Sequence, residues 1–228
     1  MTPIPKTFFI TGLGRSGTKY LSSVLDRSRR YHVIHEWRVP RTPFQDTNLT
    51  HFPIWRFYLA RHPLGDLRSG YGEVNSYLRR TIHPDRVGPE AAIEKRGIIL
   101  RDPRDIVSSA MNRRGRTAAD FPALCEDKVR GFARLLDLLA HPTLRYERFE
   151  FRRFTTEPAY VRQIAEWAGI DDLEIPPEVV AKKVNQSERS SFPRWGDWSA
   201  DLKATFQAVA DRHGVMPAVE SLAAPDES

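Results

Sequence analysis

The sequence predicts an α/β fold in which a parallel sheet is covered by helices on both faces. Short apolar strands alternate with helical segments along the chain, which is the pattern of parallel sheets. The run Gly97–Leu100 is compact and apolar, as expected for a strand buried on both faces. The stretch Thr7–Tyr20 predicts a short strand, a glycine-rich turn and a helix that runs to about Arg27.

That first strand-turn-helix unit predicts a phosphate cradle. Glycines in the turn let backbone N–H groups approach an anion closely. The helix behind them begins with free N–H groups and a partial positive charge. The residues expected to contact the phosphate are Gly14, Arg15, Ser16, Gly17, Thr18, Lys19 and Tyr20.

The turn differs from the nucleotide-binding loop of P-loop NTPases at one position. Gly12 and Gly17 have the spacing of that pattern, but Thr18 follows Gly17 where the NTPase lysine stands. Lys19 comes one residue late, so its side chain leaves the helix in another direction. The cation is supplied from inside the loop by Arg15. The arrangement G-x-x-R-S-G-T resembles the 5′-phosphosulfate loop of sulfotransferases that use 3′-phosphoadenosine 5′-phosphosulfate (PAPS).

Further elements follow from periodicity and helix-end signals. Two more strands are expected, at Tyr31–His35 and Tyr71–Asn75, and a third at Leu144–Phe149. Asp102 as N-cap and Pro103 as the first helical residue begin a helix that runs to about Arg114. The other expected helices are Ser76–Thr81, Glu90–Arg96, Phe121–Leu139, Pro158–Gly169, Glu178–Val184 and, last, Asp201–His213. The chain is expected to form one domain over residues 1–228, frayed from about 220.

Composition narrows the partners and the compartment. A net charge of +6 favours anionic ligands, but the arginine clusters are scattered and no nucleic-acid motif is present. No stretch is long enough to cross a bilayer, and the histidines show no metal-ligand spacing. Cys125 is the only cysteine and is expected to be a buried side chain in a reducing cytoplasm.

A second motif distinguishes between phosphate chemistries. Arg101 ends a strand, and Ser109 returns eight residues later from the following helix. An arginine offers a forked, permanently charged donor to phosphate, and Ser109 lies two helical turns on. The segment resembles the 3′-phosphate-binding segment of PAPS sulfotransferases. The resemblance implies a single-domain, P-loop-like α/β/α fold with PAPS as sulfuryl donor and no metal.

A third segment resembles tyrosylprotein sulfotransferases in the order and spacing of its residues, over 12–41. Its second half reads His35–Glu36–Trp37–Arg38–Val39–Pro40–Arg41. The resemblance implies that Glu36 is the catalytic base and that Arg15 stabilises the leaving phosphate. We further expect that Tyr20 stacks on adenine, that Arg194 closes over the 3′-phosphate, and that Trp37 and Arg38 contact the acceptor.

The sequence departs from the family pattern at two places. Lys19 replaces a second threonine that is usual after Thr18, and Glu73 and Asn75 stand where many relatives offer a lysine near the acceptor. The expected acceptor is therefore a hydroxyl of a carbohydrate, a phenol or another small molecule. The alternatives are a P-loop-type nucleotide kinase and a non-catalytic nucleotide-binding protein of the same fold.

Overall fold

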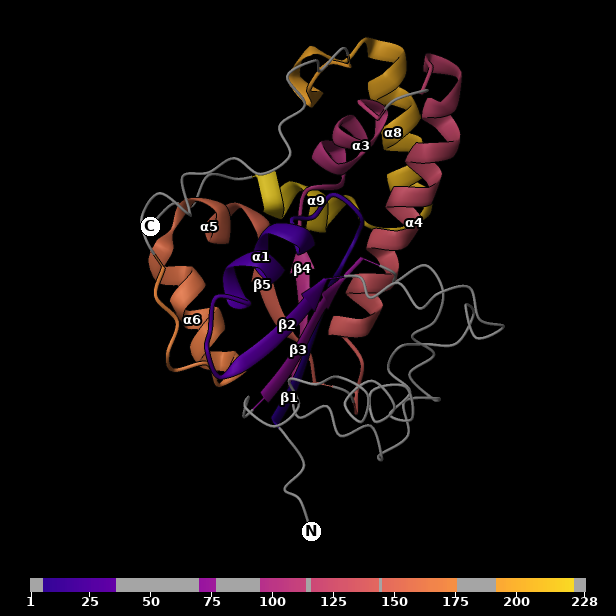
Figure 1. Ribbon diagram of the computed structural model, residues 1–228. Helices are drawn as coiled ribbons and strands as arrows, with labels where there is room; N and C mark the ends of the chain where they lie inside the picture. The colour runs from indigo at the N-terminus through magenta and orange to yellow at the C-terminus, as the bar shows by residue number, and fades with distance from the viewer. Residues whose placement is uncertain are drawn as a thin grey trace, which may run out of the picture.

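The computed structural model of the 228-residue chain describes residues 6–35, 70–76, 95–113, 116–143, 145–175 and 192–223 (Figure 1). In these ranges one parallel sheet runs in the order β2-β3-β1-β4-β5. Its strands are β1 Lys6–Gly12, β2 Tyr31–His35, β3 Gly70–Asn75, β4 Lys95–Leu100 and β5 Glu147–Glu150. Strand β1 is the central strand, and the glycine-rich turn follows it at the carboxyl edge of the sheet.

Capping residues mark the start of α3 and the end of α6. The α-helices are α1 Thr18–Leu25, α3 Pro103–Met111, α4 Phe121–Leu139, α5 Phe151–Thr156, α6 Pro158–Ala168, α8 Ala200–Arg212 and α9 Met216–Ala223, and the 3₁₀ turns are η2 Ala118–Asp120 and η3 Trp195–Asp197. Asp102 caps α3 by accepting a hydrogen bond from the backbone N–H of Arg104 at 2.8 Å. Gly169 closes α6 with φ 85°, a left-handed conformation that suits glycine.

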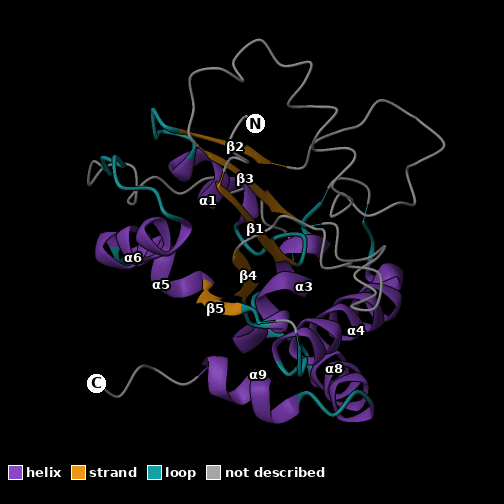
Figure 2. Ribbon diagram, turned by 90° about the horizontal axis from the view of Figure 1, so that it is seen from below, coloured by secondary structure: helices purple, strands orange, loops and turns teal. Residues whose placement is uncertain are grey.

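Helices lie on both faces of the sheet (Figure 2), and alternating side chains of the strands divide the core between these faces. Phe8, Ile10 and Ile99 pack against α1, α5 and α6 on one face. Ile98 and Leu100 pack against α3, α4, α8 and α9 on the other. The predicted α/β class, a parallel sheet covered by helices on both faces, is confirmed.

Several element predictions agree with the structure and several need correction. The strand Tyr31–His35 and the helix Phe121–Leu139 have the predicted bounds. Lys95 and Arg96, predicted to end a helix, belong to β4 because they pair with Phe8 and Phe9 of β1. The strand predicted at Leu144–Phe149 is observed as β5, which begins three residues later and ends one residue later. The predicted helix Glu178–Val184 and the segment 77–94 lie outside the described residues.

The C-terminal part contains more helix than the sequence predicts. Helix α5 was not expected, and α8 is followed by α9. Val219 of α9 is fully buried in the core on the α4 side, so the chain remains ordered to Ala223 where a frayed end was predicted. None of the helices in the described ranges combines the length and the apolar character that crossing a bilayer requires.

Candidate active site

Two residues of the loop between β1 and α1 have a backbone in the left-handed region. Gly17 has φ 82° and Arg15 has φ 81°, and Arg15 is the one non-glycine residue with positive φ among those described. A non-glycine residue in this region costs about 1–3 kcal/mol unless its surroundings hold it there. A Cβ at Gly12 would lie 2.4 Å from Ser16 Oγ, so the loop closes tightly only with glycine at that position. The turn is therefore compact and strained at Arg15.

The compact turn directs donors toward a common point. The N–H of Ser16 bonds to the Leu13 carbonyl at 2.9 Å, and the N–H of Leu21 bonds to the Gly17 carbonyl at 3.0 Å. Between them, the N–H groups of Gly17, Thr18 and Lys19 have no acceptor in the described part of the chain. Free N–H groups at the start of a helix attract an anion.

Two side-chain donors at the cradle are also buried without an acceptor. Ser16 is 0% exposed, and its Oγ has no hydrogen-bond partner among the described residues. The buried Nε of Arg101 has none among them either. A buried polar group without a partner costs about 1–3 kcal/mol, so such groups are usually satisfied by protein, water or ligand. The donor set fits a bound phosphate or phosphosulfate group.

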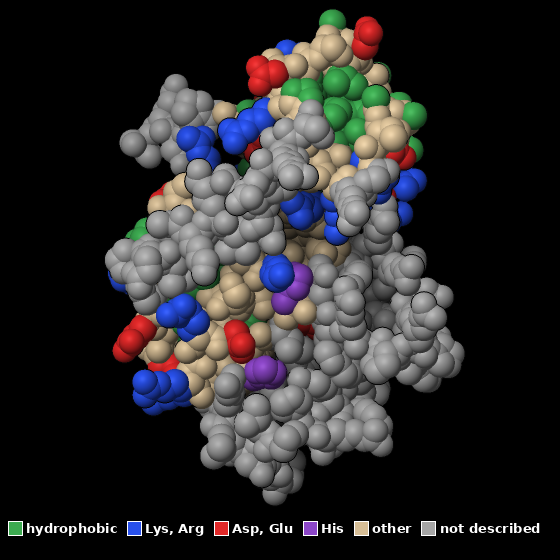
Figure 3. All heavy atoms as spheres, turned by 45° about the horizontal axis from the view of Figure 1, so that its top comes forward, with side chains coloured by type: hydrophobic (Ala, Val, Ile, Leu, Met, Phe, Trp, Pro, Cys, Tyr) green, Lys and Arg blue, Asp and Glu red, His purple; other side chains and the backbone are tan. Residues whose placement is uncertain are grey.

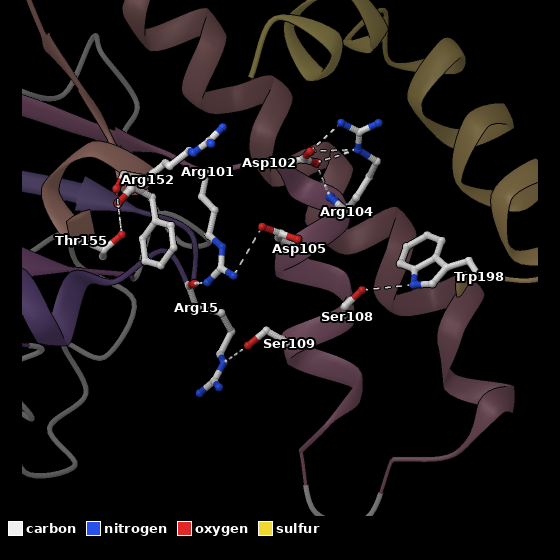
Figure 4. Close-up of polar contacts among 11 residues, drawn as sticks. Arg15, Arg101, Asp102, Arg104, Asp105, Ser108, Ser109, Arg152, Thr155 and Trp198 are labelled. Carbon is white, nitrogen blue, oxygen red and sulfur yellow. Dashed lines mark hydrogen bonds and ion pairs between the residues drawn. The ribbon is translucent and has the colours of Figure 1, made fainter. Parts of the chain in front are cut away.

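Arg15 connects the loop to the second motif (Figure 4). Arg101 Nη1 donates to the Arg15 carbonyl at 2.6 Å, and Arg15 Nε donates to Ser109 Oγ at 2.9 Å. Asp105 lies on the other side of the Arg101 guanidinium, with Oδ2 3.7 Å from Nη2. The end of β4, helix α3 and the loop after β1 therefore meet at one place, where the sequence predicted that Arg101 and Ser109 would converge.

The electrostatics of this place are strongly positive. Burial lowers the pKa of Arg15, and the charge of Arg113 lowers it further. Burial also lowers the pKa of Arg101; Asp105 opposes this effect and Arg15 adds to it. Figure 3 shows basic side chains gathered on the face that carries the carboxyl ends of the strands. Partly desolvated arginines close together favour binding of a multiply charged anion.

Sequence reasoning missed one residue that touches both motifs. The guanidinium carbon of Arg101 lies 4.1 Å from the ring centroid of Phe151, the first residue of α5. The same ring lies against Gly17, where a Cβ would come within 2.7 Å of Cδ2 and Cε2. No local signal marks Phe151, because its position depends on how β5 pairs with β4.

The structure also shows which predicted residues do not line the cradle. Tyr20 is 6% exposed and its ring stacks on Phe154 in the core, with centroids 6.1 Å apart, so the predicted stacking on adenine does not fit this position. Lys19 is exposed on α1. Arg194 is exposed before η3, and none of its described contacts joins it to the cradle.

The predicted acceptor residues are distributed differently from the phosphate residues. Glu73 and Asn75 are 1% and 4% exposed. Asn75 Nδ2 donates to Glu73 Oε1 at 2.8 Å, and Thr11 Oγ1 donates to Asn75 Oδ1 at 3.2 Å. This burial gives no support to a direct contact of Glu73 or Asn75 with an acceptor.

The predicted base follows directly on a residue that does reach the cradle. His35, the last residue of β2, has Nε2 3.2 Å from Oγ1 of Thr18. Glu36, Trp37 and Arg38 follow it and lie outside the described residues. Thr18 therefore links the cradle to the strand end that leads to the predicted base.

Among the described residues there is neither a reactive thiol nor a metal centre. Burial, together with Glu126, raises the pKa of Cys125 to about 12, so its thiol is held in the protonated form that is a poor nucleophile. Within the ranges that the structure describes, His, Cys, Asp and Glu side chains form no group of three that could hold a metal ion.

Comparison with known proteins supports the fold. The crystal structure of a sulfotransferase from Alicyclobacillus acidocaldarius is similar to this chain, with a TM-score of 0.59 and 17% sequence identity. The match covers 97% of this chain and 96% of that one. No family model matches the chain. No curated protein matches it either. At this identity the likeness shows that the two chains share a fold over nearly their whole lengths.

Proposed function

We propose that this chain is a PAPS-dependent sulfotransferase that transfers the sulfuryl group to a hydroxyl of a small acceptor such as a carbohydrate or a phenol. The observation that carries the proposal is the meeting of Arg15, Arg101 and Ser109 beside a cradle with buried, unsatisfied donors. A nucleotide with phosphates on both its 3′ and 5′ positions would use both motifs at once. The sulfotransferase named in the structural comparison supports the same reaction class.

The two motifs would divide the donor nucleotide between them. The N–H groups of Gly17, Thr18 and Lys19, the hydroxyl of Ser16 and the Arg15 guanidinium would hold the 5′-phosphosulfate. Arg101 and Ser109 would hold the 3′-phosphate, which fixes the position of the sulfur relative to the acceptor. PAPS itself supplies an activated sulfuryl group whose leaving group is a phosphate.

Transfer is proposed to be direct and in line. Glu36 takes the proton of the acceptor hydroxyl while that oxygen forms a bond to sulfur. The bond between sulfur and the 5′-phosphate oxygen breaks, and the phosphate keeps the electron pair. Arg15 and the N–H groups of the loop stabilise the negative charge that develops on that oxygen.

Binding of 3′-phosphoadenosine 5′-phosphate (PAP), compared with binding of AMP, tests the proposal directly. The protein should bind PAP at least about tenfold more tightly than AMP, because a charge-assisted hydrogen bond to the 3′-phosphate contributes about 1.5–3 kcal/mol. Titration calorimetry measures both affinities. Arg101→Ala should remove the preference, and it should weaken AMP binding by a smaller factor, because Arg101 Nη1 also holds the Arg15 carbonyl of the 5′-phosphate loop.

The control variant is Arg101→Lys, which keeps the charge but loses the forked donor. It should retain part of the preference for PAP. Equal affinities of the natural chain for PAP and AMP would refute the assignment. Mg²⁺-dependent turnover of ATP would instead identify the chain as a kinase, since the proposed sulfuryl transfer requires neither Mg²⁺ nor ATP.

A further inference from the structure

Phe151 lies next to Arg101 because of the pairing between β4 and β5. Leu100 pairs with Glu150 in the parallel ladder, and each is the last residue of its strand. The residues that follow, Arg101 and Phe151, therefore leave neighbouring strands side by side at the carboxyl edge of the sheet. Phe151 then begins α5, whose Thr155 Oγ1 donates to the Phe151 carbonyl at 2.8 Å.

The Phe151 ring has a different neighbour in each direction. The Arg101 guanidinium carbon lies 4.1 Å from its centroid, which is the distance of a close cation–π contact. Gly17 of the cradle leaves no room for a Cβ beside the ring. Phe154 meets the ring edge-on at a centroid distance of 5.5 Å, and Phe154 itself stacks on Tyr20 of α1. The ring is therefore supported from behind by the core and touches both phosphate motifs.

The Arg101 side chain depends on few other contacts for its position. Its Nη1 donates to the Arg15 carbonyl, its Nη2 is 3.7 Å from Asp105, and its Nε has no acceptor in the part of the chain that the structure describes. An arginine has many rotamers, and holding it in one of them costs conformational entropy. Neighbours that already hold the side chain in the free protein lower the part of this cost that ligand binding must meet. A cation–π contact is strongest where the cation is partly desolvated, as the guanidinium of Arg101 is here.

We infer that Phe151 is a positioning residue that sets the preference for a 3′-phosphate by holding the Arg101 guanidinium against the cradle. The inference rests on the proposed function and adds to it a residue and a role. Arg101 held by the ring presents its remaining donors to the 3′-phosphate while its Nη1 fixes the carbonyl of Arg15. The aromatic face thus couples the 3′-phosphate contact to the shape of the 5′-phosphate loop.

The test is the ratio of the AMP and PAP dissociation constants in Phe151 variants. Phe151→Leu keeps an apolar side chain of similar volume and removes the aromatic face, so the ratio should fall about tenfold. Phe151→Tyr keeps the aromatic face and should retain the ratio within about threefold. Titration calorimetry with PAP and with AMP measures the ratio for each variant.

Two controls separate positioning from general packing. Phe206→Leu removes a fully buried ring from the core on the α4 side, on the other face of the sheet from Phe151; it should lower the melting temperature and leave the ratio unchanged. In an Arg101→Ala background, Phe151→Leu should cause no further loss of the ratio, because the group it positions is gone.

The outcomes distinguish this inference from the proposed function. If the natural chain binds PAP no better than AMP, the proposed function fails and the inference fails with it. If the natural chain prefers PAP but Phe151→Leu retains the preference, only the role of Phe151 is overturned. An equal loss in Phe206→Leu and Phe151→Leu would also overturn it, since both would then act through packing.

Discussion

At the scale of single residues, the cradle contains buried hydrogen-bond donors that have no acceptor within the described part of the folded chain. Ser16 is fully buried, with no partner for its hydroxyl among the described residues, while Ser23 of α1 is exposed and donates to the Tyr20 carbonyl at 2.8 Å. A hydroxyl buried without a partner reduces the stability of the free protein, and it contributes to binding only when an anion arrives. Ser16 and Ser23 are therefore expected to respond oppositely to truncation.

Ser16→Ala should leave the free energy of unfolding unchanged or raise it by up to about 1 kcal/mol, because an unsatisfied group is removed. The same change should weaken PAP binding about ten- to hundredfold, the loss expected for one hydrogen bond to a charged group. Urea unfolding and titration calorimetry measure the two quantities. Ser23→Ala is the matched control and should leave PAP affinity unchanged. A Ser16→Ala variant that is less stable yet binds PAP normally would show that the hydroxyl is structural.

The proposed base makes a second prediction at this scale. Glu36→Gln should keep the affinity for PAP and lose turnover by about 10²–10⁴-fold, since it removes the proton acceptor without touching the cradle. Arg15→Ala should damage both turnover and PAP affinity, because its charge meets the phosphosulfate in the ground and transition states alike. The measurements are sulfuryl transfer to an acceptor and, for Arg15, slow hydrolysis of PAPS. If Glu36→Gln retained full sulfuryl transfer, another residue would be the base. His35, which contacts Thr18, would then be the next candidate, ahead of Glu73, which is buried.

At the scale of elements, the sequence predicted what depends on local chemistry. Helix α3 begins at Asp102 and Pro103 because the cap and the fixed proline φ act within a few residues. The bounds of α4 followed from its long amphipathic pattern. Arg101 and Ser109 were assigned through the resemblance to the 3′-phosphate segment of PAPS sulfotransferases, and their spacing of two helical turns is compatible with that assignment.

Elements and contacts that depend on distant partners were not predicted. Lys95 and Arg96 join β4 through pairing with β1, which overrides their local helical pattern. Helix α9 is held by burial of Val219 against the core on the α4 side. Phe151 gains its place from the β4–β5 register, so only the folded sheet reveals it beside Arg101. Arg15, the residue with positive φ, likewise has its carbonyl bonded to Arg101, 86 residues away.

At the scale of the whole molecule, one carboxylate ties the segment after α6 to the turn between α1 and β2. Asp172 accepts hydrogen bonds from Ser28 Oγ at 2.6 Å and from the backbone N–H groups of Arg29 at 2.8 Å and Arg30 at 3.2 Å. Burial alone would raise the pKa of Asp172, but these hydrogen bonds outweigh it and lower the pKa below its ordinary value of 3.8. The neighbouring Asp171 forms an ion pair with Arg30 at 2.8 Å in which both side chains are mostly exposed.

This difference between two adjacent aspartates predicts the acid dependence of folding. A carboxylate whose pKa is lowered in the folded state contributes stability above its unfolded pKa, and this contribution is lost as the pH falls through the folded pKa. Asp172→Asn should therefore lower the free energy of unfolding by about 1–2 kcal/mol near neutral pH, the range of hydrogen bonds to a partly exposed charged group. The gap between the natural chain and the variant should shrink steadily below the ordinary value of 3.8. Asp171→Asn should change stability by less than about 1 kcal/mol at any pH, as exposed ion pairs do. Urea unfolding across this pH range measures both variants. A gap for Asp172→Asn that stays constant into acid would mean that its ionised carboxylate is not what joins these two segments.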